Sequence, residues 1–274
     1  MHTIADFRTT MSDKENPDIP SPRPIGEVIT GAVLDGNGSL TRQVYGILRN
    51  LVVELTLVPN QFLSEKDVAA CLGISRTPVR EAFILLAEDG IVRIVPKSGT
   101  YVSAIDINRA CDGYFIRAAI ESSCAAIAAE KRTVEDVRSL REILDAQKRA
   151  FTDNDFMTYY LCDNRLHESI LDIAGYSSAK RVIETVKFEV DRIRHLKMRE
   201  LMRPVEEALA DHVSIVNAVG HGNADLAREI MYRHLSRIRE SMETLIINER
   251  LWDMFHAINK TGYGKRRNKP SRSE

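Results

Sequence analysis

The stretch from Ser64 to Ala82 constrains the fold of this chain more than any other feature, because it holds two short helix signals separated by a bend. Ser64, with Asp67 three residues later, is typical of a helix-starting capping box. Gly73 permits the sharp turn that ends the first helix, and Ser75 is a preferred N-cap for a second one. The segment therefore predicts a helix-turn-helix.

The second of these helices has two different faces. Four apolar residues at helical spacing predict the side that packs inward: Val79, Ala82, Phe83 and Leu86. Arg76, Thr77 and Arg80 fall outside this stripe, so we expect them to point outward near the start of the helix. Arginines presented in this way can contact base edges in the DNA major groove.

The flanking residues complete a winged helix-turn-helix. A further amphipathic helix is predicted upstream from the spacing of Leu40, Val44, Ile47, Leu51 and Leu55. Downstream, residues 91–95 and 100–102 read as two strands joined by a Pro-Lys-Ser-Gly turn. A small helical domain with merely solvated charges is the alternative. The ordered succession of cap, glycine, second cap, arginine pair and basic hairpin tip favours DNA binding.

Charge and composition set outer limits on the function. Seven basic and six acidic residues leave a net charge of only +1 between Ser39 and Ser103, so the placement of the cations must provide any DNA contact. The whole chain has 274 residues and a net charge of −1, with room for two domains. No apolar run approaches the roughly 20 residues of a membrane span, and no signal-peptide core is present. We therefore expect a cytoplasmic protein without membrane contact.

Four segments are predicted along the chain. Residues 1–38, rich in proline and glycine, are expected to form a disordered arm, with at most a short ordered patch near Val28 to Leu34. Residues 39–104 are the winged helix-turn-helix, 105–252 an all-helical domain and 253–274 a basic tail. The cysteines are scattered without pairing motifs and are expected to be small buried side chains: Cys71, Cys111, Cys124 and Cys162.

The second domain has helical periodicity throughout. Helices are expected near residues 106–130, 133–151, 154–174, 178–197, 204–220 and 223–248. Thr133 with Asp136 marks one start as a capping box, and Gly175 and Gly222 mark two ends. Six such helices predict an antiparallel bundle, so the fold class is mainly α.

Histidines interrupt the apolar stripes of this bundle. Asp163 and His167 lie four residues apart on the inward face of one helix, while His212 and His234 lie on the inward faces of two others. Separate hydrogen bonds for each histidine are the simpler interpretation. Three imidazoles and one carboxylate would be costly to bury without partners, and one divalent metal ion would satisfy all four. Such a donor set suits zinc, and nickel or manganese are further options.

In this combination the chain resembles GntR-type transcriptional regulators of the FadR-like branch. The resemblance rests on Ser64 to Arg80, on the wing from Ile91 to Val102 and on the order Asp163-x-x-x-His167, His212, His234, and it covers about residues 39–250. It implies an FCD-type effector domain, a homodimer and an inverted-repeat operator in double-stranded DNA.

The resemblance also implies roles for particular residues. DNA contact would fall to Lys66, Ser75, Arg76, Thr77, Arg80 and Gly99. Lys66 stands where arginine is more usual in the family, which puts a bidentate contact in doubt. The metal ligands would be Asp163, His167, His212 and His234, with the metal helping to hold a small organic acid. Arg117 would approach that effector, although an ion pair with Glu121 one turn away is equally compatible with the spacing.

Four functions remain open at this stage. A ligand-responsive regulator, most often a repressor, is the preferred hypothesis. In a metal sensor the ion itself would be the signal. A metal-dependent enzyme is disfavoured because the sequence has no HExxH motif. A constitutive DNA-binding protein with an inert bundle would respond to no ligand.

Overall fold

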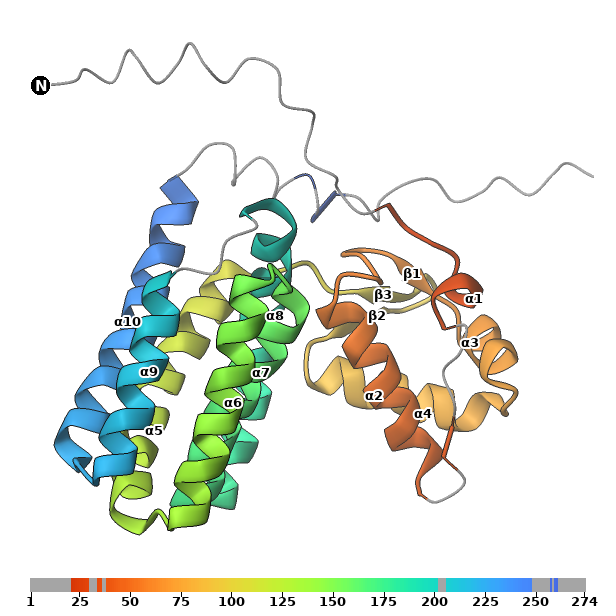
Figure 1. The fold of residues 1–274 in the computed structure, drawn as a ribbon. Helices are drawn as coiled ribbons and strands as arrows, with labels where there is room; N and C mark the ends of the chain where they lie inside the picture. The colour runs from red at the N-terminus through yellow and green to blue at the C-terminus, as the bar shows by residue number, and fades with distance from the viewer. Residues whose placement is uncertain are drawn as a thin grey trace, which may run out of the picture.

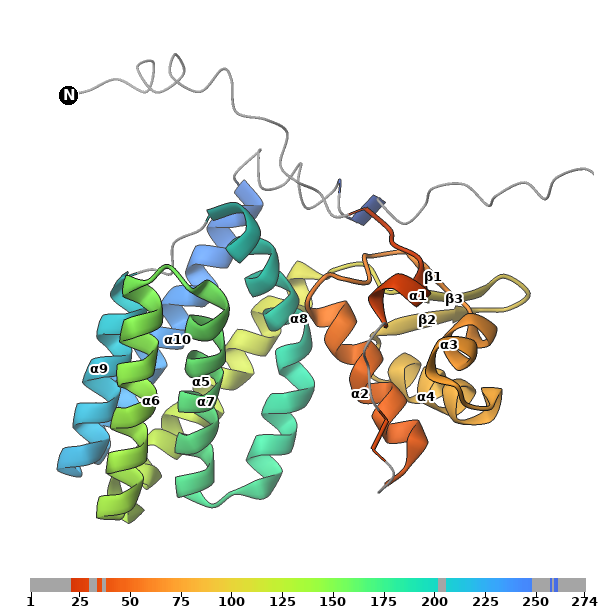
Figure 2. The ribbon, with the colours of Figure 1, turned by 45° about the vertical axis from the view of Figure 1, so that its right-hand side comes forward.

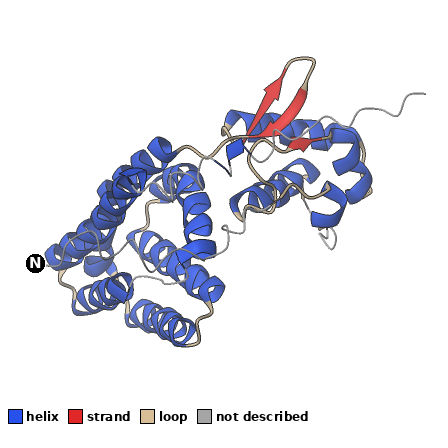
Figure 3. Ribbon diagram, turned by 90° about the horizontal axis from the view of Figure 1, so that it is seen from above, coloured by secondary structure: helices blue, strands red, loops and turns tan. Residues whose placement is uncertain are grey.

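The computed structural model describes residues 21–29, 34–35, 38–201, 206–247, 257 and 259–260. Most of the expected N-terminal arm and nearly all of the expected basic tail lie outside these residues. Within the described residues the chain forms two units, a helical bundle and a smaller unit that contains all the strands (Figure 1, Figure 3).

The N-terminal unit is a winged helix-turn-helix. Its helices are α1 (Ile25–Val28), α2 (Leu40–Val53), α3 (Glu65–Leu72) and α4 (Arg76–Glu88). Its strands are β1 (Phe62–Leu63), β2 (Val92–Val95) and β3 (Gly99–Val102), in the antiparallel order β1-β3-β2. The wing predicted from two strands therefore has a third. Strand β1 has only two residues, too few for an alternating pattern to be recognised in the sequence.

The helix-turn-helix has the local chemistry that its sequence predicts. The Ser64 hydroxyl accepts a hydrogen bond from the Asp67 backbone N–H at 3.2 Å, and Gly73 ends α3 with a φ of 66°. The predicted inward residues of α4 are all buried, in a core shared with α2 and the wing. Ser75 occupies the N-cap position of α4, but its side chain makes no cap hydrogen bond, contrary to its predicted role.

Two further expectations about this unit are wrong. Helix α2 ends at Val53, and Leu55, with a φ of 57°, lies beyond the helix to which it was assigned. Its side chain is buried in the core of the bundle instead. The expected disordered arm also contains α1, which packs against α3, and Ile29, which is buried in the N-terminal core.

In the part of the chain that the structure describes, the bundle has six helices, close to the predicted ranges. They are α5 (Ile107–Lys131), α6 (Val134–Thr152), α7 (Phe156–Ala174), α8 (Ser177–Leu201), α9 (Glu206–His221) and α10 (Ala224–Ile247). The Thr133–Asp136 capping box is present at the start of α6. Helix α5 contacts α7, α8, α9 and α10, since small buried alanines along it let its neighbours approach: Ala118, Ala125, Ala128 and Ala129.

The two units meet through α8, the bundle helix beside α2 (Figure 2). Phe188 of α8 is buried in the N-terminal core, while Leu55 reaches the bundle core in the other direction. No helix in the described part of the chain combines the length and apolar character needed to cross a bilayer. Only Cys124 of the four free cysteines is buried, and Cys71 is exposed, so the expectation of four buried thiols is wrong.

Candidate metal centre and nucleic-acid interface

The start of α4 presents a polar and cationic surface to solvent. Ser75, Arg76, Thr77 and Arg80 are all exposed, as is Lys66 in the first turn of the preceding helix. The Arg76 side chain is 67% exposed and pairs with Glu65 at 3.2 Å. An exposed pair of this kind is weak, so the guanidinium can exchange Glu65 for another acceptor.

The wing places a second polar element on the same unit. Its tip is a turn in which Lys97 is exposed and has a φ of 61°, followed by Gly99 with a φ of 126°. A Cβ at Gly99 would collide with the ring of Phe62, so the wing requires glycine both for its conformation and for space. Arg93 braces the base of the wing, with a hydrogen bond to Asn60 and a stacking contact 4.9 Å from the centre of the Tyr101 ring.

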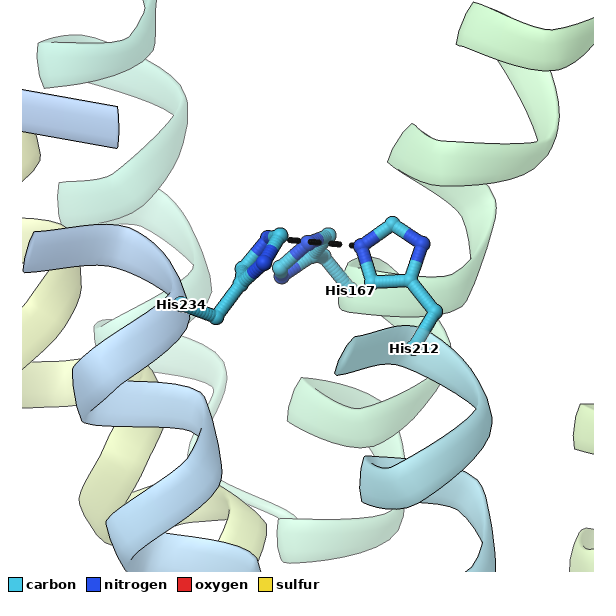
Figure 4. Close-up of side chains that lie close together, drawn as sticks. All are labelled: His167, His212 and His234. Atoms are coloured by element: carbon cyan, nitrogen blue, oxygen red, sulfur yellow. Dashed lines mark hydrogen bonds between the residues drawn. The ribbon is translucent and has the colours of Figure 1, made fainter. Parts of the chain in front are cut away.

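Three buried histidines from three different helices meet inside the bundle. His167 of α7, His212 of α9 and His234 of α10 point toward one another (Figure 4). One ligand atom from each lies within 4.8 Å of the other two. The Nε2 atoms of His212 and His234 are 3.3 Å apart. The predicted convergence of these side chains is therefore present in the structure.

Each of these imidazoles is held by a polar side chain on its outer nitrogen. Nδ1 of His167 lies 2.6 Å from a Glu121 carboxylate oxygen, Nδ1 of His212 lies 2.9 Å from Oε1 of Gln147, and Nδ1 of His234 lies 3.3 Å from Oδ2 of Asp211. An acceptor on Nδ1 selects the tautomer whose Nε2 lone pair is free. In each histidine this leaves Nε2 as the nitrogen with a free lone pair.

Asp163 lies beside this cluster and faces two kinds of partner. One carboxylate oxygen is 3.6 Å from Nε2 of His212, and the other is 2.7 Å from Nη2 of Arg194. Burial alone would raise the pKa of Asp163, but Arg194 and the neighbouring imidazoles outweigh it and lower that pKa. The carboxylate is therefore ionised and within reach of both the histidines and an arginine.

Burial disfavours the protonated form of two of these histidines, His212 and His234. Burial lowers the pKa of His212 well below its ordinary value, and repulsion from His234 adds to the effect. Burial also lowers the pKa of His234. Imidazole nitrogens with a carboxylate are the donor set that suits a borderline divalent cation such as zinc, so the chemistry of these residues fits the metal that the sequence predicts.

Arg117 forms the ion pair with Glu121 that its spacing of four residues allows. Its Nε donates to Glu121 at 2.6 Å, and both side chains are buried. Glu121 in turn accepts from His167. Burial alone would raise the pKa of Glu121, but the Arg117 guanidinium and the hydrogen bond from His167 lower it. Arg117 is therefore linked to His167 through Glu121.

Sequence reasoning missed the residues that hold the histidines in place: Glu121, Gln147, Asp211 and Arg194. Glu121 and Gln147 interrupt apolar faces of α5 and α6 as the histidines interrupt theirs, so the same signal marks them. Asp211 and Arg194 carry no such signal. His195 is buried against Tyr160, at 4.8 Å between ring centres, and lies outside the cluster.

Comparison with known families divides the chain in the same way. The sequence model described as "Bacterial regulatory proteins, gntR family" matches residues 40–102. The model of the FCD domain matches residues 112–237, the part that contains the three histidines.

Two transcriptional regulators align with this chain over most of their length. An uncharacterized HTH-type transcriptional regulator of Streptomyces ambofaciens is 36% identical over 205 residues, 74% of this chain and 85% of that protein. The HTH-type transcriptional repressor RspR of Escherichia coli K12 is 34% identical over 206 residues, 75% of this chain and 90% of RspR.

Solved structures share the fold. Escherichia coli McbR/YncC superposes with a TM-score of 0.66 at 22% identity, covering 76% of this chain and 98% of that one. A GntR transcriptional regulator of Rhodococcus sp. RHA1 gives a TM-score of 0.63 at 25% identity, covering 76% and 99%.

Proposed function

The chain belongs to the GntR family of bacterial transcriptional regulators, with an FCD domain after its winged helix-turn-helix, and from this premise we propose a metal-dependent, effector-responsive repressor. The observation that carries the metal-dependent part is the convergence of His167, His212 and His234, each with its outer nitrogen held by a side-chain acceptor. The name of RspR supports repression as the direction of the response.

In the proposed DNA complex, helix α4 lies in the major groove. Arg76 and Arg80 contact base edges, with guanine the favoured partner of arginine, while Thr77, Ser75 and Lys66 contact bases or phosphates nearby. The wing, with Gly99 at its tip, follows the adjacent backbone or minor groove. Two copies of the chain would place two such helices on an inverted repeat. The exposure of these side chains supports the proposal.

In the proposed effector domain, His167, His212, His234 and Asp163 hold one divalent cation, with zinc first and nickel or manganese as alternatives. The cation would supply a positively charged site for a carboxylate. Arg194, beside Asp163, adds a second cationic group from this chain. We therefore propose a small organic acid as effector. The intrahelical pairing of Arg117 with Glu121 favours a supporting role for Arg117.

Effector binding would change operator affinity by favouring one arrangement of the bundle over another. A ligand shifts such an equilibrium only by its difference in affinity for the two arrangements, and the same coupling acts in both directions. A metal sensor differs only in which ligand carries the signal. The relatives are regulators, which gives the enzyme hypothesis no support.

One experiment tests the DNA-binding surface. Arg76→Ala is expected to weaken binding to the operator by about 1–3 kcal/mol, because a base contact is lost. Arg138→Ala on α6 is the matched control, since Arg138 is 63% exposed and also pairs with a glutamate. Footprinting should first identify the protected inverted repeat. Equal operator affinity for wild type and Arg76→Ala would refute the proposed role of α4.

A second experiment separates an effector-responsive regulator from a metal sensor. Operator affinity is measured on metal-free and zinc-loaded protein, each with and without a panel of small carboxylic acids. The proposal expects the acids to change affinity only when zinc is bound. A response to zinc alone, with no effect of any acid, would favour the metal sensor instead.

A further inference from the structure

Four residues join the two units, and their backbone groups are hydrogen-bonded both to the winged unit and to the bundle helix α8. These residues, Ser103 to Asp106, lie between β3 and α5. The Ser103 N–H donates to the Ile91 carbonyl, and the Asp106 N–H donates to Glu189 at 3.3 Å. Most backbone groups of this segment are therefore hydrogen-bonded within the protein, unlike those of a flexible linker.

Two side chains account for the other contacts of this linker. Arg192 donates to the carbonyls of Ser103 and Ala104, at 2.9 and 3.3 Å. The side-chain amide of Asn259 accepts from the Ile105 N–H at 2.8 Å and donates to the Ile105 carbonyl at 3.1 Å. Asn259 also accepts from the Asn60 side chain through its backbone carbonyl, so it contacts the winged unit as well.

Arg192 is fully buried, and its partner Glu189 is nearly so. The two form an ion pair at 3.3 Å. Burying a charged pair is stable only when most of its hydrogen-bonding capacity is used. Here both Nη groups of Arg192 donate to the linker backbone, whereas its Nε has no hydrogen-bond partner among the described residues. A loosened linker would therefore leave a buried guanidinium short of acceptors, which ties the position of the linker to that of α8.

The same helix also contacts the histidine site. Arg194, two residues after Arg192, pairs with Asp163 at 2.7 Å. Residues two apart on a helix point about 200° from each other, so α8 touches the site on one face and the linker on the other. Phe188, one turn earlier, is buried in the core of the winged unit. Figures 1 and 2 show α8 between the rest of the bundle and that unit.

We propose that α8 is the coupling element of this protein: Arg194 senses the state of Asp163, and Arg192 with Glu189 transmits it to the linker that orients the winged helix. This inference rests on the proposed metal centre. A cation bound by the histidines competes with Arg194 for the Asp163 carboxylate. Any shift of α8 that follows is passed to the linker, because Arg192 and Glu189 of α8 are hydrogen-bonded to the linker backbone.

The test uses the full-length protein with zinc as the probe. Hydrogen exchange is measured at the Ile105 and Asp106 amides, and operator affinity is measured with and without zinc. In wild type, zinc should change the exchange rate of both amides. It should also change operator affinity by a factor of about 5–150, the usual range for coupling between two sites. In Arg192→Lys, one ammonium cannot hold both carbonyls. In this variant the Ile105 and Asp106 amides should exchange at least about tenfold faster than in wild type. The ratio of operator affinities with and without zinc should approach one.

Arg181→Lys is the control, since Arg181 lies on the same helix, is exposed and donates a hydrogen bond to Ser178 of that helix. This variant should behave as wild type. If Arg192→Lys does not fold, Glu189→Gln, which changes the α8 partner of both Arg192 and the Asp106 N–H, decides the question by the same two measurements.

The outcomes separate this inference from the proposed function. Zinc binding that leaves linker exchange unchanged in wild type, or Arg192→Lys with unaltered exchange and zinc response, overturns the inference while the metal centre stands. A wild-type protein that binds no zinc contradicts the metal centre itself, and the coupling role of α8 falls with it.

Discussion

The histidine site depends on pairs of residues more than on single ones. A buried imidazole can serve as a ligand only when its tautomer and ring orientation are fixed, and here Glu121, Gln147 and Asp211 do this from α5, α6 and α9. Five of the six bundle helices thus contribute to the site through these residues and the histidines. Substitution of Glu121, Gln147 or Asp211 should therefore lower metal affinity although it removes no proposed ligand.

Substitution of Glu121 tests this point. Glu121→Gln should weaken zinc binding by about 10–100-fold, because the acceptor on His167 loses its charge. It should also destabilise the fold by about 3–5 kcal/mol, because the buried Arg117 loses its partner. Zinc titration and denaturant unfolding measure the two effects. Glu130→Gln, an exposed change on the same helix, should alter neither. Unchanged zinc affinity in Glu121→Gln would contradict the supporting role of this carboxylate.

Acid should destabilise the metal-free protein through His212 and His234. Their folded-state pKa values lie below the ordinary value of about 6.5, so the unfolded chain takes up protons first as the pH falls. Stability is therefore complete above about pH 6.5 and declines below it, by at most about 1.4 kcal/mol per pH unit for each histidine. Carboxylates with lowered pKa values act only at more acidic pH.

Denaturant unfolding in a chelator between about pH 7 and pH 5.5 measures this decline. The His212→Ala variant should show a shallower pH dependence than wild type, since one of the two depressed groups is gone. A flat profile in the wild type would show that folding does not lower the pKa values of these imidazoles.

At the scale of single elements, the wing depends on one glycine. Gly99→Ala should disrupt the β2–β3 hairpin, because an alanine there has an unfavourable φ and meets the Phe62 ring. Operator affinity should fall, since the wing could no longer follow the DNA backbone. Electrophoretic mobility shift and thermal unfolding measure the two effects.

Gly46→Ala in α2 is the matched control for Gly99→Ala. Nothing lies within 4 Å of the added carbon, and alanine in a helix interior is favoured by about 1 kcal/mol. This variant should be as stable as wild type or more so, with unchanged operator affinity. Full operator affinity in Gly99→Ala would contradict the proposed contribution of the wing.

An element can be predicted from the sequence when the residues that define it lie within the element itself. Amphipathic spacing and caps identify every bundle helix, α3 and α4 to within a few residues, because those signals lie inside the element. Strand β1 and the path of Leu55 depend on partners far along the chain, and no local pattern reports them. The inward-facing histidines were predictable for the same reason as the helices. Arg194 and Asp211 were not, because their partners lie on other helices.

At the scale of the whole molecule, the winged helix-turn-helix and the helical bundle are joined by residues that each contributes to the hydrophobic core of the other. Phe188 belongs to the core of the winged unit, and Leu55 belongs to the core of the bundle. Each unit therefore restricts the orientation of the other. In the proposed dimer, a small rotation at this junction would alter the spacing of two recognition helices, and operator affinity with it.

The most direct test of this account is a calorimetric zinc titration of the metal-free protein. Wild type should bind one zinc ion per chain. His212→Ala should lose that binding, because the Nε2 of His212 lies within reach of both His234 and Asp163. His221→Ala is the control on the same helix, since His221 is exposed and bonds only to the Asn217 carbonyl, and it should bind zinc as wild type does. Absence of zinc binding in the wild type, or equal binding in His212→Ala, would contradict the metal centre.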